Sequence, residues 1–149
     1  LNLMLQDITK RLQPLAGAKG VSLQLEQMKE ILADVDAMKL SLAISNLVDN
    51  AVKYTPQDGT VKVVLDADHQ NAFITVADTG IGIPEDEINR IFERFYRVDK
   101  TRDRETGGTG LGLSITHGTI MMHNGSIKVN SKEEEGTTIL VRIPLHQSV

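Results

Sequence analysis

The sequence has no cysteine among its 149 residues, which excludes disulfides, thiolate metal sites and a cysteine nucleophile. It also has no apolar stretch near the ~20 residues of a membrane-spanning helix. No basic flank followed by an apolar segment marks a secretion signal at its start. Positive charge is not in excess either, because 16 Lys and Arg stand against 20 Asp and Glu, a formal net charge of −4. We therefore expect a soluble, intracellular domain that neither binds nucleic acid nor contacts a membrane directly.

The composition is otherwise that of an ordinary globular protein, with 40% hydrophobic residues. The length suits one domain with one sizeable core, so we expect a single domain over 1–149. The chain begins with Leu1 and not with Met, which predicts a piece of a longer protein.

Hydrophobic periodicity predicts the secondary structure. Leu5, Ile8, Leu12 and Leu15 recur at helical spacing, so a first helix is expected over 1–18, with a kink or restart at Pro14. Alternation then predicts strands over 21–25, 61–66, 72–78, 126–131 and 137–145. Further helices are expected over 37–54, 85–92 and 111–122. The predicted fold class is α+β: a two-layer sandwich with a mixed, largely antiparallel sheet of about five strands on about three helices.

The helix over 37–54 carries two stripes of different chemistry. Leu40, Ile44, Leu47 and Ala51 form an apolar stripe, whereas Asn46, Asn50 and Lys53 lie at i, i+4 and i+7 on a polar one, with Tyr54 between them. A neutral amide oxygen can complete the octahedral shell of Mg²⁺, and a lysine can face phosphates. The alternative is an ordinary solvated helix face, and the sequence of this helix alone does not distinguish the two interpretations.

Asp78 ends a predicted strand and enters the turn D78-T-G-I-G-I-P84. A carboxylate there can accept a hydrogen bond from an amino group at the floor of a pocket. Gly80 and Gly82 would let the backbone approach a flat base without a Cβ in the way. The alternative is an ordinary tight turn, for which Asp and Gly are also typical.

Glycines lead into the helix expected over 111–122, in the run G107-G-T-G-L-G-L-S-I115. Free N–H groups at the positive end of a helix suit a phosphate group. A polar stretch over 98–109 precedes it, which indicates a mobile segment. Most of the few aromatic residues lie just upstream, in I91-F-E-R-F-Y-R97, where they favour a small cluster that anchors this segment. Arg97 and Arg102 could reach phosphates from a closing lid.

These four elements, in this order, resemble the catalytic domain of sensor histidine kinases, within the superfamily shared with DNA gyrase and the MutL repair proteins. N46-L-V-D-N50-A-V-K53-Y54 resembles the family's N box, D78-T-G-I-G-I-P84 its first glycine box, I91-F-E-R-F-Y-R97 its F box and G108-T-G-L-G-L-S-I115 its second glycine box. The resemblance spans nearly the whole chain and implies a Bergerat-type ATP-binding fold with an ATP lid over 98–110.

The resemblance also implies residue roles. Asp78 would bind the adenine amino group beside Gly80 and Gly82, with Tyr54, Ile83 and Leu113 walling the base. Asn50 would hold Mg²⁺ with Asn46 beside it, and Lys53, Arg97 and Arg102 would contact phosphates. Catalysis would rest on Asn46, Asn50, Lys53 and Arg97. Further nucleotide contacts are implied for Tyr96, Gly108, Thr109, Gly110, Leu111, Gly112 and, through water, Thr137.

The implied activity is transfer of the ATP γ-phosphate to a histidine outside this chain. Asn46 stands where the hydrolases of the superfamily have a Glu, and an amide cannot act as a general base, so hydrolysis should be poor. The acceptor motif matches none of the four His, so the acceptor-histidine hairpin is expected to be absent and the fragment monomeric. The implied partners are ATP or ADP, that hairpin and, indirectly, a response regulator. The implied location is cytoplasmic, as part of a membrane-anchored bacterial sensor. Alternatives are a conformational ATPase of the gyrase or MutL type and a nucleotide-binding regulatory module without catalysis.

Overall fold

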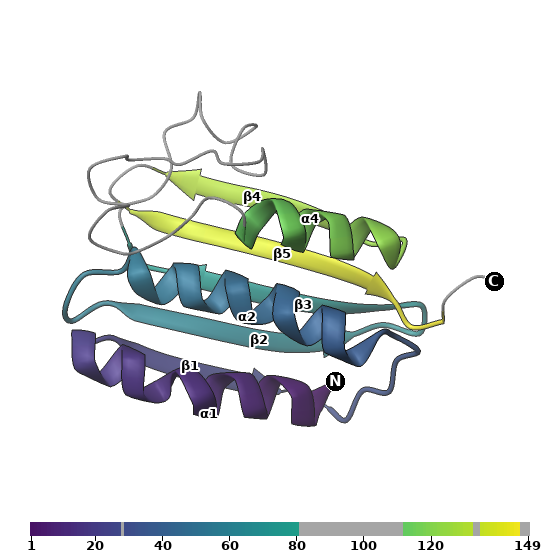
Figure 1. The fold of residues 1–149 in the computed structure, drawn as a ribbon, viewed down its shortest axis with the longest axis horizontal. Helices are drawn as coiled ribbons and strands as arrows, with labels where there is room; N and C mark the ends of the chain where they lie inside the picture. Colours follow the sequence, from purple (N-terminus) through teal and green to yellow (C-terminus); the bar gives the residue numbers. More distant parts are fainter. Residues whose placement is uncertain (28, 81–111, 133–134, 147–149) are drawn as a thin grey trace.

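The computed structural model describes residues 1–27, 29–80, 112–132 and 135–146. In this part of the chain one mixed sheet of five strands is covered on one face by three helices, the two layers seen in Figure 1. The elements are α1 (Asn2–Lys19), β1 (Ser22–Gln27), α2 (Ala37–Lys53), β2 (Thr60–Ala67), β3 (Asn71–Asp78), α4 (Gly112–Met122), β4 (Ser126–Lys132) and β5 (Gly136–Pro144). The predicted α+β sandwich is confirmed.

The strand order in the sheet is β1-β2-β3-β5-β4. β1 pairs with β2 in parallel, because α2 carries the chain back across the sheet between them, and the other three pairings are antiparallel. Each predicted strand lies within about two residues of its observed bounds, which is the usual uncertainty of an element end.

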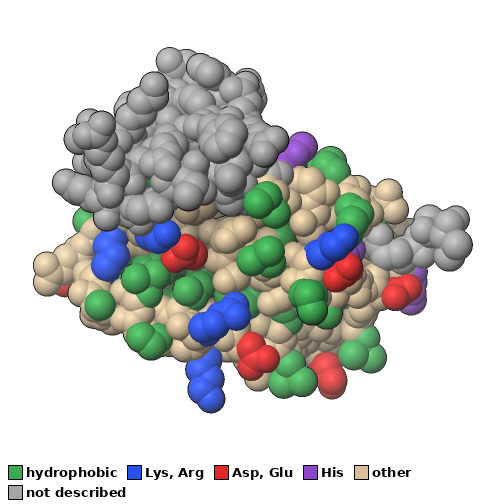
Figure 2. Space-filling view, in the orientation of Figure 1, with side chains coloured by type: hydrophobic (Ala, Val, Ile, Leu, Met, Phe, Trp, Pro, Cys, Tyr) green, Lys and Arg blue, Asp and Glu red, His purple; other side chains and the backbone are tan. Residues whose placement is uncertain are grey.

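The core lies between the sheet and the helices. Alternate residues of the central strands point into it and are buried: Val61, Val63 and Leu65 of β2, Ala72, Ile74 and Val76 of β3, and Val141 and Ile143 of β5. The apolar stripe of α2 packs on them, and Leu5 and Ile8 of α1 and Ile120 of α4 complete the cluster. The outer surface of the helix layer carries charges of both signs interspersed with hydrophobic side chains (Figure 2).

Local chemistry sets the helix ends. Asp36 is the N-cap of α2, as predicted, and its Oδ1 accepts a hydrogen bond from the N–H of Lys39 at 3.0 Å. Pro14 lies inside α1, which runs unbroken from Asn2 to Lys19, so the restart considered there is wrong. Pro14 is exposed, and water can solvate the carbonyl that its missing N–H leaves unpaired.

No helix in the described ranges is long and apolar enough to cross a membrane. The helix predicted over 85–92 lies outside the described residues.

Candidate functional site

Three chain segments meet at one end of the sheet: the C-terminal end of α2, the end of β3 and the start of β5 (Figure 1). Asp78 at the end of β3 is paired with Thr137 near the start of β5. Two residues on, Gly80 packs against the last turn of α2, because a Cβ at this position would lie 2.4 Å from the carbonyl oxygen of Tyr54. The glycine at position 80 is therefore required for packing against Tyr54, and not only for the approach of a ligand.

Asp78 is half-buried, and one of its carboxylate oxygens is held by the backbone. Its Oδ1 accepts hydrogen bonds from the N–H of Gly80 at 2.8 Å and from the N–H of Thr137 at 3.2 Å. Burial raises the pKa of the Asp78 carboxyl, and the two backbone donors offset part of that rise. Within the described ranges Oδ2 accepts no hydrogen bond. The carboxylate is thus fixed in orientation, and its second oxygen meets no donor from the described part of the chain.

The start of β5 supports Asp78 from the neighbouring strand. Gly136 has a φ of +125°, and a Cβ there would lie 2.1 Å from the carbonyl oxygen of Asp78, so no larger residue fits without a shift. Thr137 is buried, and its Oγ1 is 2.8 Å from the hydroxyl of Ser131. The contact that the structure shows between Thr137 and the site is its N–H bond to Asp78, and the predicted water-mediated contact with a base stays a prediction.

The turn after α2 is tied to the end of β3. Thr79 donates its N–H to the carbonyl of Thr60 at 3.1 Å and accepts the N–H of Thr60 on its Oγ1 at 2.9 Å. Thr55 is fully buried and donates its hydroxyl to the carbonyl of Ala51 at 2.6 Å. The two Thr60–Thr79 bonds tie the start of β2 to the residue after β3, and the Thr55 bond closes the end of α2 on itself.

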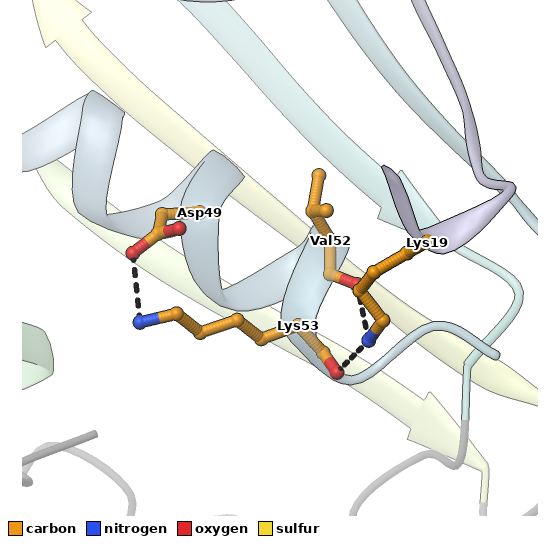
Figure 3. Close-up of polar contacts among 4 residues, drawn as sticks. All are labelled: Lys19, Asp49, Val52 and Lys53. Atoms are coloured by element: carbon orange, nitrogen blue, oxygen red, sulfur yellow. Dashed lines mark hydrogen bonds and ion pairs between the residues drawn. The ribbon is translucent and has the colours of Figure 1, made fainter. Parts of the chain in front are cut away.

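The polar stripe of α2 faces away from the core, as predicted. Asn46, Asn50 and Lys53 are half-buried, whereas Leu47 and Ala51 are buried. Lys53 Nζ lies 3.1 Å from Oδ2 of Asp49, four residues earlier on the same helix (Figure 3). The ammonium of Lys53 is therefore directed along the stripe by a carboxylate.

Lys19, the last residue of α1, binds the C-terminal end of α2 (Figure 3). Its Nζ donates to the carbonyl oxygen of Val52 at 3.1 Å and to that of Lys53. A cation at this helix end also complements the helix dipole. Burial lowers the pKa of the Lys19 ammonium. Lys19 thereby connects α1 to the turn of α2 that carries Lys53.

A divalent cation at this site would depend on oxygen ligands that are mostly neutral. No group of three or more His, Cys, Asp or Glu side chains is placed to hold a metal within the described ranges. The amide oxygens of Asn46 and Asn50 suit a hard cation that keeps several waters and takes the remaining ligands from phosphates. The donor set fits Mg²⁺ brought in with a nucleotide better than a structural metal.

Comparison with known proteins identifies the family. Residues 35–147 match the family described as Histidine kinase-, DNA gyrase B-, and HSP90-like ATPase. The chain belongs to this ATPase family. The match includes all of α2, β3 and β5, whose ends meet at the corner of the sheet that holds Asp78, whereas Lys19 precedes the match.

Relatives and solved structures of the family are named as histidine kinases. Sensor histidine kinase RppB of Synechocystis sp. is 40% identical over 146 residues, which cover 97% of this chain and 32% of RppB. Sensor histidine kinase WalK of Bacillus subtilis is 40% identical over 118 residues, covering 78% of this chain and 19% of WalK. The chain thus spans about a third or less of these relatives.

Solved structures of histidine kinases have the same fold. The catalytic domain of histidine kinase ThkA superposes with a TM-score of 0.85 at 26% identity, covering 98% of this chain and 93% of that one. Full-length ShkA in complex with AMPPNP gives a TM-score of 0.80 at 28% identity, covering 98% of this chain and 30% of that one.

The structure brings Tyr54, Asp78, Gly80 and Thr137 into contact at this corner. The predicted residues Asn46, Asn50 and Lys53 lie on the last turns of α2, which lead into it. Gly112 and Leu113 lie in the first turn of α4. The remaining predicted site residues, Gly82, Ile83, Tyr96, Arg97, Arg102, Gly108, Thr109, Gly110 and Leu111, lie outside the described residues, as does most of the predicted lid.

Sequence reasoning missed four residues that shape the corner: Lys19, Asp49, Thr79 and Gly136. Asp49 could have been found, because it lies four residues before Lys53 on a predicted helix, a spacing that favours ion pairs. The other three act through contacts between segments far apart in sequence. No local pattern signals them.

Proposed function

We propose that the chain binds Mg-ATP at the corner of α2, β3 and β5 and donates the γ-phosphate to a histidine on the acceptor hairpin of the same sensor kinase. The observation that carries the proposal is the Asp78 carboxylate. One oxygen is held by two backbone N–H groups, and the other accepts nothing in the described ranges. An adenine amino group is a donor of the kind this oxygen lacks, and a fixed carboxylate selects it over a carbonyl.

The polar stripe of α2 supports the phosphate half of the proposal. Asn50, with Asn46 beside it, would hold Mg²⁺ through amide oxygens, and Lys53 would contact the phosphates. When bound, the ion would neutralise charge on the phosphates, and these residues of the chain would position them for in-line attack. Arg97, Arg102 and the lid over 98–110 remain predictions for the same phosphates, since they lie outside the described residues.

Transfer to an outside histidine is supported by what the chain offers as acceptors. Asn46 cannot deprotonate a water, so water is a poor acceptor. His123 is buried, with Nδ1 2.8 Å from the carbonyl of Thr119 and Nε2 accepting the N–H of Asp36 at 3.0 Å, so neither nitrogen is open to a phosphoryl group. His69, His117 and His146 are exposed but, like His123, stand in no acceptor motif. We therefore propose that the acceptor lies on a helical hairpin outside this chain, in the cytoplasm, and that this chain alone is a monomer, as sedimentation can test.

The deciding experiment is steady-state phosphate release from Mg-ATP by this chain, together with transfer of labelled γ-phosphate to a separately prepared acceptor hairpin. We expect nucleotide binding with almost no phosphate release, and labelling of the hairpin at histidine. Sustained turnover without labelling, abolished by Asn50→Ala, would instead make the chain a conformational ATPase of the gyrase or MutL type. Nucleotide binding with neither phosphate release nor labelling of the hairpin would make the chain a regulatory nucleotide-binding module.

A further inference from the structure

Asp49 is an acidic residue within the polar stripe of α2, directly before Asn50 and four residues before Lys53. Its Oδ2 lies 3.1 Å from Lys53 Nζ, and the two side chains are 30% and 25% exposed, respectively (Figure 3). Helical spacing places Asp49 on the side of the stripe that Lys53 also occupies. The cation that this stripe offers to phosphates is therefore already paired with a carboxylate.

This pairing sets the charge that a nucleotide meets at the helix. Asn46 and Asn50 are neutral, and the charges of Asp49 and Lys53 cancel, so the stripe has no net positive charge. Phosphate groups carry several negative charges at neutral pH, and Asp49 repels them while it competes for Lys53. A partly exposed ion pair is weak, so a change in local charge can separate it.

We propose that Asp49 makes nucleotide binding by this chain depend on a divalent cation, an inference that rests on the proposed function. Without the cation, Asp49 neutralises Lys53 and repels the phosphates. With a hard cation beside Asn50, the positive charge of the cation offsets the negative charge of Asp49 through space, since adjacent helix residues do not share one face. The charge of Asp49 is then balanced, and Lys53 is available to the phosphates.

The test is the affinity for ADP measured by calorimetry, once with EDTA and once with excess magnesium, for the wild type and for Asp49→Asn. The ratio of the two dissociation constants measures the dependence on the cation. We expect Asp49→Asn to tighten binding in EDTA by about threefold to tenfold, from the removal of one charge near the phosphates. Binding with magnesium should change much less, so the ratio falls. High salt should shrink the effect.

Glu26→Gln is the matched control. Glu26 forms an ion pair with Lys62 at 2.8 Å, so this variant makes the same charge change and also breaks a surface ion pair. Glu26 lies near the end of β1, and that strand starts beside Thr60, close to the site, and runs away from it. The ratio for Glu26→Gln should equal that of the wild type. Asp49→Ser serves as a second variant and should reproduce the result of Asp49→Asn, and thermal melting of each variant reports folding.

Three results would overturn the proposal: weaker binding of Asp49→Asn in EDTA, an unchanged ratio, or an equal change of the ratio in Glu26→Gln. Weaker binding in both conditions would show that Asp49 only orients Lys53. Asp78→Asn, measured alongside, separates this inference from the site itself. If Asp78→Asn binds ADP as tightly as the wild type, the adenine site and the role of Asp49 both fail. If Asp78→Asn loses ADP binding while the ratio for Asp49→Asn equals that of the wild type, only the proposed role of Asp49 is refuted.

Discussion

Replacing Asp78 by Asn should weaken ATP binding strongly and leave the fold intact. The oxygen of the new amide must still accept the N–H groups of Gly80 and Thr137, because these two donors face Oδ1 and need an acceptor. The amide nitrogen then takes the place of Oδ2. In the variant, an N–H donor of the protein therefore faces the adenine amino group, which is itself a donor. The wild type presents an acceptor oxygen there.

The magnitude follows from the hydrogen bond that is lost. A hydrogen bond to a charged group contributes about 1.5–3 kcal/mol, and an unsatisfied donor adds a cost of similar size. We expect a loss of about 3 kcal/mol or more, which is roughly a hundredfold in Kd. Inosine triphosphate carries an acceptor where ATP carries the amino group, so its affinity for Asp78→Asn should rise relative to that of ATP.

The same substitution should not destabilise the free protein. Burial raises the pKa of Asp78 above its ordinary value of 3.8, so the ionised carboxylate opposes folding at neutral pH. The Asp78 carboxyl makes its full contribution to stability below pH 3.8, and this contribution is lost as the pH rises through the raised pKa. The wild type should therefore be no more stable than Asp78→Asn at pH 7, and the difference between the two should shrink toward pH 4.

Calorimetry with ATP and inosine triphosphate, and urea unfolding of the free proteins at several pH values, test both parts. Asp66→Asn is the control, because Asp66 is an exposed acid on the neighbouring strand β2 and, among the described residues, accepts only the N–H of Ala67. ATP binding by Asp78→Asn within threefold of the wild type would refute the adenine role. A large loss of stability at pH 7 would refute the argument from burial.

Three further variants test how the corner is built. Gly136→Ala should lower the free energy of unfolding by about 3 kcal/mol in urea, because its Cβ would lie 2.1 Å from the carbonyl oxygen of Asp78 at a φ that favours glycine; an unchanged midpoint would contradict this. Asp36→Ala should cost about 1 kcal/mol in the same assay through loss of the N-cap of α2, and Asp36→Asn should restore most of it. Lys19→Met should cost about 1–2 kcal/mol by removing the donor to the last carbonyls of α2, whereas Lys10→Met, an exposed lysine of the same helix, should be neutral. Equal effects of the two lysine variants would count against the role of Lys19.

The elements and their faces could be predicted from the sequence because they depend on local spacing. The apolar stripe of Leu40, Ile44, Leu47 and Ala51 recurs at the helical period, and the alternation in β2 and β3 leaves one sheet face to pack on it. Asp36 could be predicted as the N-cap of α2 because an N-cap also depends on local sequence. The restart considered at Pro14 was wrong because the cost of a proline depends on exposure of the helix face, which is a tertiary property.

The sequence by itself determined which chemical groups the corner offers: an acid at a strand end, amides and a lysine on one helix face, and glycines at turns. Tertiary structure alone decided how they are held. Asp78 is oriented by Thr137, 59 residues away, Gly80 must be small because of Tyr54, and Lys19 reaches the end of α2 from another helix. These contacts join segments whose separation has no fixed period, so only packing of the sheet against the helices could bring them together.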